Sequence, residues 1–218
     1  MLEGAIIGAV VGVIVSVVML LKRGSIRKKV LGTLQAQGPA AARSLLDRRI
    51  PPTRKIALRQ ILDQRERMAA LTIFGDVAAL EEEVAAHGGS LTAVVQVNGV
   101  ALLGAALRSA DARPAAERLV GLAEQIEREG GITMGLVKKK TRALATLAMG
   151  VTGVPIPTET RLTLDGLAGE GGMVQILIWQ ALARAVDAMG QREQAASLRR
   201  KVEELTSAFA QPPGHAAA

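Results

Sequence analysis

The first 21 residues constrain this chain more than any other stretch of its sequence. From Gly4 to Leu21 there is no charged side chain, and Lys22 and Arg23 follow directly. A helix rises about 1.5 Å per residue, so about 20 apolar residues cover the hydrocarbon core of a bilayer. A helix also pairs its own backbone N–H and C=O groups, as lipid requires. The sequence therefore predicts a single transmembrane anchor over residues 1–21.

Two other interpretations of this stretch stay open. A cleaved export signal normally carries positive charge before its apolar run, whereas Glu3 is the charged side chain that precedes this run and the basic residues follow it. A buried core helix is normally interrupted by polar residues, and between Gly4 and Leu21 only Ser16 carries a hydroxyl. Both features favour the anchor.

Basic residues cluster at the carboxyl end of the apolar run, and this sets the expected orientation. Lys and Arg favour the cytoplasmic side of a membrane. We therefore expect a single-pass protein of the inner, cytoplasmic membrane, with its N-terminus outside and residues 22–218 in the cytoplasm. The basic side chains should face the anionic lipids of that leaflet, at about 1 kcal/mol each. They are Lys22, Arg23, Arg27, Lys28 and Lys29.

Three glycines in the apolar run, Gly4, Gly8 and Gly12, are spaced by four residues and share one helix face. Small residues at this spacing let two membrane helices approach closely. The pattern predicts a homo-oligomer formed through the anchor. Glycine is also frequent in membrane helices in general, so that explanation stays open.

Composition predicts an all-α domain after the anchor. The chain is 49% hydrophobic but only 1% aromatic, so its core must be built from Ala, Leu, Val, Ile and Met. Ala and Leu are strong helix formers. The sequence has no cysteine, which excludes disulfides and thiolate metal sites. The abundance of Ala, Arg and Gly indicates a bacterial protein.

The net charge of +7 is unevenly distributed. Between Lys22 and Arg67 there are thirteen Lys and Arg residues against three acidic ones, whereas the remainder is slightly acidic. We interpret the basic part as lying on the bilayer. It contains no aromatic residue, and single-stranded nucleic acids are usually bound by aromatic stacking. These features argue against a nucleic-acid partner.

Glycine and proline breaks divide the chain after the anchor. Gly38-Pro39 and Pro51-Pro52 delimit two short helices, Gly24 and Ser25 should interrupt the basic cluster, and Thr53 should cap a long helix. The expected segments are basic juxtamembrane helices (22–52), a helical repeat domain (53–149), a Gly/Pro-rich irregular segment (150–172), a C-terminal helical hairpin (173–210) and a disordered tail (211–218).

The stretch Leu91 to Leu107 is long and apolar enough to suggest a second membrane span. Gln96 and Asn98 lie within it and argue against that interpretation. We expect a buried helix here. Because the stretch begins with several β-branched residues, a strand over its first part is the alternative.

A repeated pattern follows four of the breaks. Ala-Ala pairs begin at Ala41, Ala78, Ala115 and Ala195, with spacings of 37, 37 and 80 residues. The last spacing is close to two periods, with a missing or diverged copy in the Gly/Pro-rich segment. Periods of this length are typical of stacked helix pairs, each of which buries its face against its neighbours.

The last unit resembles the tetratricopeptide repeat family. The resemblance rests on Trp179, Leu182-Ala183 and Val186 in the first helix, Gly190 in the turn and Ala195 in the second helix. It implies an α-solenoid of stacked helical hairpins that binds protein segments on a concave face.

Polar residues do not form a recognisable catalytic constellation. His87 ends a helix beside Gly88, where a positive charge suits the helix dipole. The run Glu81 to Glu83 should be solvated surface, because neighbouring positions do not share a helix face. Asp165 and Glu170 lie in the Gly/Pro-rich segment and are candidates for ligand contact. We assign no catalytic, cofactor-binding or metal-binding residue.

The sequence thus predicts a non-enzymatic, membrane-anchored scaffold or adaptor, in which a cytoplasmic helical domain binds a partner protein, as in a subunit of a membrane complex. Two alternatives remain. One is a module that binds a lipid or small ligand with residues 150–172 as a lid. The other is a membrane-bound enzyme that uses the same segment.

Overall fold

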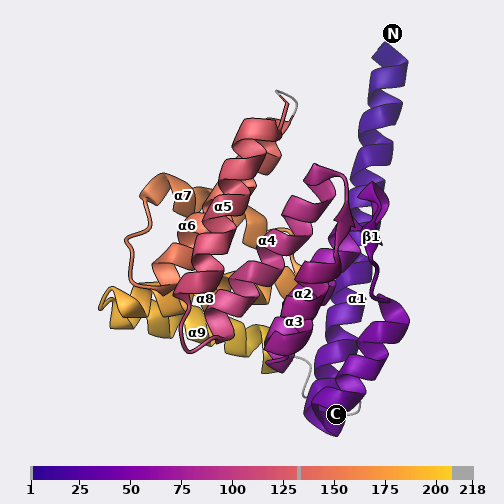
Figure 1. Ribbon diagram of the computed structural model, residues 1–218. Coiled ribbons are helices and arrows are strands. Elements are labelled where there is room, and N and C mark those ends of the chain that lie inside the picture. The colour runs from indigo at the N-terminus through magenta and orange to yellow at the C-terminus, as the bar shows by residue number, and fades with distance from the viewer. Residues whose placement is uncertain (1, 132–133, 208–218) are drawn as a thin grey trace.

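A computed structural model describes residues 2–131 and 134–207, with side chains from Gly24 onward. The described chain is all-α apart from one pair of two-residue strands, which confirms the predicted class (Figure 1). The helices are α1 (Leu2–Arg49), α2 (Ile61–Phe74), α3 (Val77–Ala86), α4 (Leu91–Arg108), α5 (Arg113–Glu129), α6 (Gly135–Val151), α7 (Thr158–Ala168), α8 (Gly172–Ala188) and α9 (Arg192–Ser207).

Helix α1 starts in the apolar run and continues into the folded domain. Gly24 and Ser25 interrupt the basic cluster in the sequence but do not break the helix, which passes through both residues. Just after them, Ile26, Val30 and Leu31 are buried in the core, and this packing outweighs the weak local preference for a break. The amino-terminal part of α1, indigo in Figure 1, projects beyond the rest of the fold.

The expected break at Gly38-Pro39 is present as a kink within α1. Gly38 has φ +81° and ψ 179°, which is not helical. A positive φ suits glycine because it has no Cβ to clash with the backbone. Proline follows at the start of the second arm, residues 39–49, where a missing N–H is tolerated.

The link between α1 and α2 differs from the prediction. Thr53 does not cap a helix, since residues 55–60 form strand β1 (Lys55–Ile56) and the short 3₁₀ helix η1 (Leu58–Gln60). Strand β1 pairs in parallel with β2 (Gly88–Gly89), which follows α3. At Gly89 an added Cβ would lie 2.8 Å from the Ile56 carbonyl oxygen, so this pairing requires glycine.

Successive helical hairpins build the domain, as the Ala-Ala pattern predicted. Helices α2 and α3, α4 and α5, α6 and α7, and α8 and α9 pack in pairs, and each pair contacts the next. The Ala-Ala pairs after the first lie in the second helices α3, α5 and α9. One alanine of each pair is buried: Ala42, Ala79, Ala116 and Ala195. The result is a helical bundle compatible with a helical-repeat fold.

The last helical hairpin packs back against the first. Helix α8 of the last hairpin packs against α2 of the first and also against α4, and α1 packs against both α2 and α8. The first helices of the hairpins therefore bury their inner faces against one another. The described residues of the expected segments 53–149 and 173–210 therefore contribute to one common core.

Helix α4 confirms the expected buried helix over Leu91–Leu107. Among the residues with described side chains, it is the one helix long and apolar enough to cross a membrane, but 72% of it is buried inside the domain. Ser90 caps it by accepting a hydrogen bond from the Ala93 N–H. The predicted span over residues 1–21 lies outside the described side chains.

The Gly/Pro-rich segment is more regular than expected. Residues 150–172 contain α7, which begins after Pro157 and packs Leu164, Leu167 and Ala168 into the core. These residues have the i, i+3, i+4 spacing of one helix face, and their burial outweighs the low helix propensity of the glycines. Helices α8 and α9 pack against each other as a hairpin. Residues 208–210 of the expected hairpin segment 173–210 and the tail 211–218 lie outside the described residues.

Helices α2 and α4 approach closely at Gly104, and we expect Gly104→Ala to lower the free energy of unfolding by about 1–3 kcal/mol. A Cβ at this position would collide with Thr72 Oγ1, which donates to the Met68 carbonyl inside the core. Urea unfolding in detergent measures the effect.

The control is Gly121→Ala in α5, where an added Cβ meets open space. This change should stabilise the protein by up to about 1 kcal/mol through helix propensity. Adding Thr72→Ala to Gly104→Ala should recover part of the loss. Equal effects at Gly104 and Gly121 would contradict the close approach of α2 and α4.

Candidate functional site

The most unusual feature of the domain is a run of four buried polar residues at the centre of α2, Gln64 to Arg67. Four consecutive helical residues point to all sides of a helix, because each is turned by about 100° from the last. Their joint burial means that α2 is enclosed on every side. A buried polar group destabilises the fold unless it is paired, and each of the four has a partner on a different segment of the chain.

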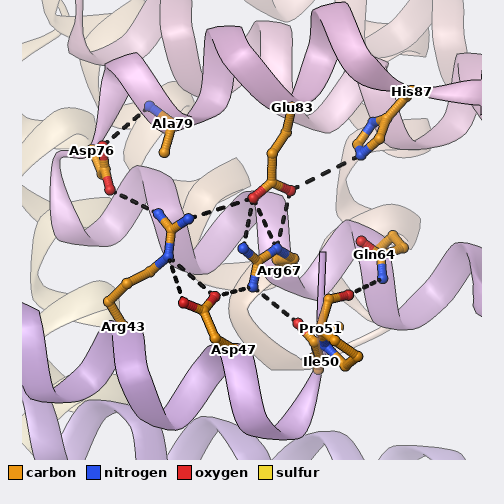
Figure 2. Close-up of polar contacts among 10 residues, drawn as sticks. All are labelled: Arg43, Asp47, Ile50, Pro51, Gln64, Arg67, Asp76, Ala79, Glu83 and His87. Carbon is orange, nitrogen blue, oxygen red and sulfur yellow. Dashed lines mark hydrogen bonds and ion pairs between the residues drawn. The ribbon is translucent and has the colours of Figure 1, made fainter. Parts of the chain in front are cut away.

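Arg67 makes the densest set of bonds, and Figure 2 shows it between α1 and α3. Its side chain is 0% exposed. Nε and Nη2 donate to Glu83 Oε1 at 3.0 and 2.6 Å. Nη1 donates to Asp47 Oδ1 at 2.6 Å and to the Ile50 carbonyl at 2.9 Å. These bonds join α2 to the carboxyl end of α1 and to α3.

Charge balance explains why this guanidinium is stable in the interior. Burial by itself would lower the pKa of Arg67, but the hydrogen bonds and charges of Glu83 and Asp47 outweigh burial and raise that pKa above its usual value. A buried charge of this kind is tolerated only with good geometry and satisfied donors. The arrangement fixes how α1, α2 and α3 meet.

Arg43 and His87 extend this network at its edges (Figure 2). Arg43 Nη1 donates to Asp76 Oδ2 at 2.8 Å, and Asp76 also caps α3 through the Ala79 N–H. His87 Nδ1 lies 3.0 Å from Asn98 Oδ1 on α4, and its side chain is 1% exposed. His87 thus ends α3 as expected, and its ring joins α3 to α4.

Glu66 points toward the amino end of α8. Its Oε2 accepts the Met173 N–H at 2.7 Å. The first N–H groups of a helix lack partners within the helix and carry partial positive charge, so a carboxylate is stabilised there. An added Cβ on Gly172, where φ is +70°, would overlap the Glu66 carboxylate. Glycine at this position therefore makes room for the charge.

Arg65 points to the α7–α8 connection. Its Nη1 donates to Glu170 Oε2 at 2.9 Å, and Lys140 Nζ of α6 donates to Glu170 Oε1 at 2.5 Å. Glu170, a candidate for ligand contact in the sequence, is therefore engaged with two cations of the fold, while Asp165 is exposed. Burial alone would raise the pKa of Glu170, but Arg65 and Lys140 outweigh burial and hold it below 4.5.

We expect Glu170→Gln to lower stability in a pH-dependent way. Because the pKa of Glu170 is lower in the folded state, its carboxylate stabilises the fold above about pH 4.5 and loses this effect as the pH falls through the folded pKa. The stability difference between the wild type and Glu170→Gln should thus be largest near pH 7 and shrink as the pH falls through the lowered folded pKa.

Urea unfolding over this pH range makes the measurement, with the exposed Glu129→Gln as control. The control should show little difference from the wild type at any pH. If the loss of unfolding free energy caused by Glu170→Gln is the same at neutral and acidic pH, the ion pairs of Glu170 with Arg65 and Lys140 are contradicted.

The predicted membrane-facing residues divide into two groups. Lys28 and Lys29 are exposed. Arg27 instead turns toward the domain, where its Nη1 donates to Gln175 Oε1 at 3.3 Å and burial lowers its pKa, with Glu66 acting in the opposite direction. Lys22, Arg23, Gly4, Gly8 and Gly12 lie within helix α1, but their surroundings lie outside the described side chains.

The basic excess between residues 22 and 67 is therefore only partly available to lipid. Arg65 and Arg67 form ion pairs in the interior. Arg43 lies within ion-pair distance of three carboxylates, those of Asp47, Asp76 and Glu83. Among residues 24–67, whose side chains are described, the exposed basic residues are Lys28, Lys29, Arg48, Arg49, Arg54, Lys55 and Arg59.

Two hollows lie on the surface of the α5–α6–α7 part of the domain. A groove of about 520 Å³ between α5 and α6 has an apolar floor of Val120, Ala123, Ala145, Met149 and Val154.

A second hollow, a polar cleft of about 570 Å³ between α6 and α7, is lined by several charged side chains. They are Lys138, Lys139, Arg142, Glu127 and Glu159.

Glu83 is one of the buried polar residues whose role sequence reasoning missed. The prediction of a solvated Glu81 to Glu83 run holds for Glu81 and Glu82, which are exposed, but is wrong for Glu83. Its position relative to Ala79 and Leu80 has the i, i+3, i+4 spacing of the buried face. That spacing was a signal that Glu83 faces the core.

No group of three or more His, Asp or Glu side chains that could hold a metal ion occurs among the residues described. Comparison of the chain with protein-family models, with curated proteins and with solved structures found no match. The tetratricopeptide resemblance therefore rests on the residues of the last hairpin alone, and function must be argued from the geometry.

Proposed function

We propose that this chain is a non-enzymatic, membrane-anchored adaptor: α1 crosses the inner membrane, and the helical domain on its cytoplasmic side binds a partner protein. The observation that carries the proposal is the continuity of α1, which runs unbroken from the apolar stretch into the domain core. A helix that belongs to both parts fixes the domain at the membrane surface, as an adaptor requires.

The buried charged residues join helices to one another, and this supports a binding role for the domain over catalysis. Arg67, Glu83, Glu66 and Glu170 hold helices together and do not converge on a cleft. A catalytic site normally brings titratable groups together around an open space where a substrate fits. Here the buried charges stabilise one arrangement of helices.

The groove between α5 and α6 is the best place for the partner. It is an apolar trough bordered by charged residues such as Glu124 and Arg128. Amphipathic helices bind in such grooves by inserting apolar side chains at i, i+3, i+4 and i+7. We therefore propose that the partner contributes a helix to this groove.

The alternative of a ligand module with residues 150–172 as a lid is less well supported. Helix α7 buries Leu164 and Leu167 at 0% and 1% exposure. Opening such a lid would expose both side chains to water, at about 1.5–3 kcal/mol for each. Deletion of the segment would also damage the core, so surface substitutions give a cleaner test.

Affinity capture from detergent-solubilised membranes tests the adaptor, with wild-type chain compared with Val154→Arg. Val154 is 40% exposed in the groove, so arginine fits without disturbing the core and introduces a charge where an apolar side chain should dock. We expect the specific partner to be recovered by the wild type and lost from Val154→Arg. The control is Leu162→Arg on α7, at 71% exposure, which should retain the partner.

The same capture with a chain lacking residues 1–21 separates the two parts of the proposal. Recovery by both forms places binding in the helical domain, whereas recovery only with α1 intact places it in the anchor. If neither Val154→Arg nor removal of residues 1–21 changes which proteins are captured, the adaptor proposal fails. Homo-oligomerisation through Gly4, Gly8 and Gly12 belongs to the anchor and is tested by crosslinking in membranes.

A further inference from the structure

We propose that the domain touches the bilayer at a second place, the junction of α5 and α6, where Leu136 and Lys139 contact anionic phospholipid. This inference rests on the proposed anchoring of α1. It assigns a lipid-contact role to residues far from the basic cluster that follows the apolar run. For brevity, Gly135, Leu136, Lys138 and Lys139 are termed the α5–α6 tip.

The distance along α1 forces the domain close to the membrane. The predicted span ends at Leu21, and Ile26 is already buried in the domain core at 8% exposure. Five helical residues rise only about 7.5 Å. Because the helix has no break between these positions, no flexible spacer lifts the domain away, and the surface nearest the amino end of α1 must lie against the headgroups.

The α5–α6 tip is on that side of the domain. In Figure 1 the carboxyl end of α5 points in the same direction as the amino end of α1. Helix α6 starts at Gly135, directly after the short connection from α5. Among the described residues, the large apolar side chain at this end is Leu136, which is 66% exposed. An exposed leucine there suits insertion between lipid headgroups.

The charges at the tip match an anionic surface. Lys139 is exposed, and Lys138 lies beside it with its ammonium 3.9 Å from Glu127 Oε2. Near the end of α5, Arg128 Nη1 lies 4.0 Å from Glu124 Oε2, and Glu129 accepts a hydrogen bond from Gln125 Nε2. A basic residue near an anionic leaflet strengthens binding to it about fivefold. The tip therefore combines a leucine that inserts with one exposed lysine, Lys139, that holds it at the surface.

A fluorescent probe at the tip tests the contact. The chain contains no cysteine, so Gly135→Cys provides one labelling site, and an added Cβ there meets open space. The labelled full chain is reconstituted into vesicles of phosphatidylcholine and phosphatidylglycerol that carry a headgroup nitroxide quencher. The matched control is Asp111→Cys, which is exposed and precedes the other end of α5, about 25 Å away along that helix.

We expect strong quenching at Gly135→Cys and weak quenching at Asp111→Cys. Adding Lys139→Glu, or omitting phosphatidylglycerol, should reduce quenching at the tip, with about a fivefold weaker attraction for each lost basic contact. Equal quenching at both probes, or quenching unaffected by Lys139→Glu and by lipid charge, would overturn the lipid contact.

Vesicle flotation separates this inference from the proposed anchor. A chain that floats with vesicles and resists alkaline extraction, but is not quenched at the tip, disproves the second contact and leaves the anchor intact. A chain that does not float at all disproves the anchor, and the tip contact falls with it.

Discussion

Glu83→Ala is expected to lower the free energy of unfolding by about 3–5 kcal/mol, because it leaves the charge of Arg67 in the interior without its main partner. The Arg67 side chain is 0% exposed and cannot turn to solvent. Asp47 remains bonded to Nη1, but it is itself 42% exposed and neutralises the guanidinium less completely. Urea unfolding of the full chain in detergent, followed by circular dichroism, measures the loss.

Two variants distinguish the ion pair from a general effect of mutating α3. Glu82→Ala changes the exposed neighbour and should alter stability by less than about 0.5 kcal/mol. The double variant Arg67→Met/Glu83→Leu removes both charges and fills the site with apolar side chains, so it should be much more stable than Glu83→Ala alone. If the double variant is the less stable of the two, the pairing of Arg67 with Glu83 is not what stabilises this junction.

The double substitution Val11→Arg/Val15→Arg is expected to move the protein from the membrane fraction to the soluble fraction. Each arginine near the centre of a spanning helix opposes insertion by about 2.5–3.5 kcal/mol. Both positions lie in the apolar part of α1, well before Ile26, the first residue that is buried among those with described side chains. Flotation after alkaline extraction of cell membranes gives the fraction that stays integrated.

The conservative change Val11→Leu/Val15→Leu is the control and should remain fully integrated. A soluble Val11→Arg/Val15→Arg chain with an unchanged circular dichroism spectrum would show that the domain folds without the membrane. Integration of the arginine variant at the wild-type level would contradict the interpretation of residues 1–21 as a span.

The parts of the fold that depend on local pattern could be predicted from the sequence. Helix α4 follows from its apolar run, and the kink at Gly38 follows from a Gly-Pro pair. Ala195 lies in the second helix of its hairpin, as the sequence predicted. Each of these signals lies within a few residues of the structure it specifies, so no knowledge of tertiary contacts is needed.

The parts that depend on distant contacts were not visible in the sequence. Glu66 is stabilised by a backbone group 107 residues away, and Arg65 pairs with a residue 105 positions later. No local pattern links such residues. The same holds for the continuity of α1 through Gly24 and Ser25 and for the existence of α7, because in both cases burial of apolar side chains outweighs local helix propensity.

Cysteine accessibility in intact bacterial cells tests most directly whether α1 anchors the domain on the cytoplasmic side. Glu3→Cys and Ser207→Cys each place one thiol in a chain that otherwise has none, one before the apolar run and one at the exposed end of α9. A membrane-impermeant maleimide should label Glu3→Cys in intact cells and Ser207→Cys only after the membrane is opened. Labelling of Ser207→Cys in intact cells would place the domain outside and contradict the account.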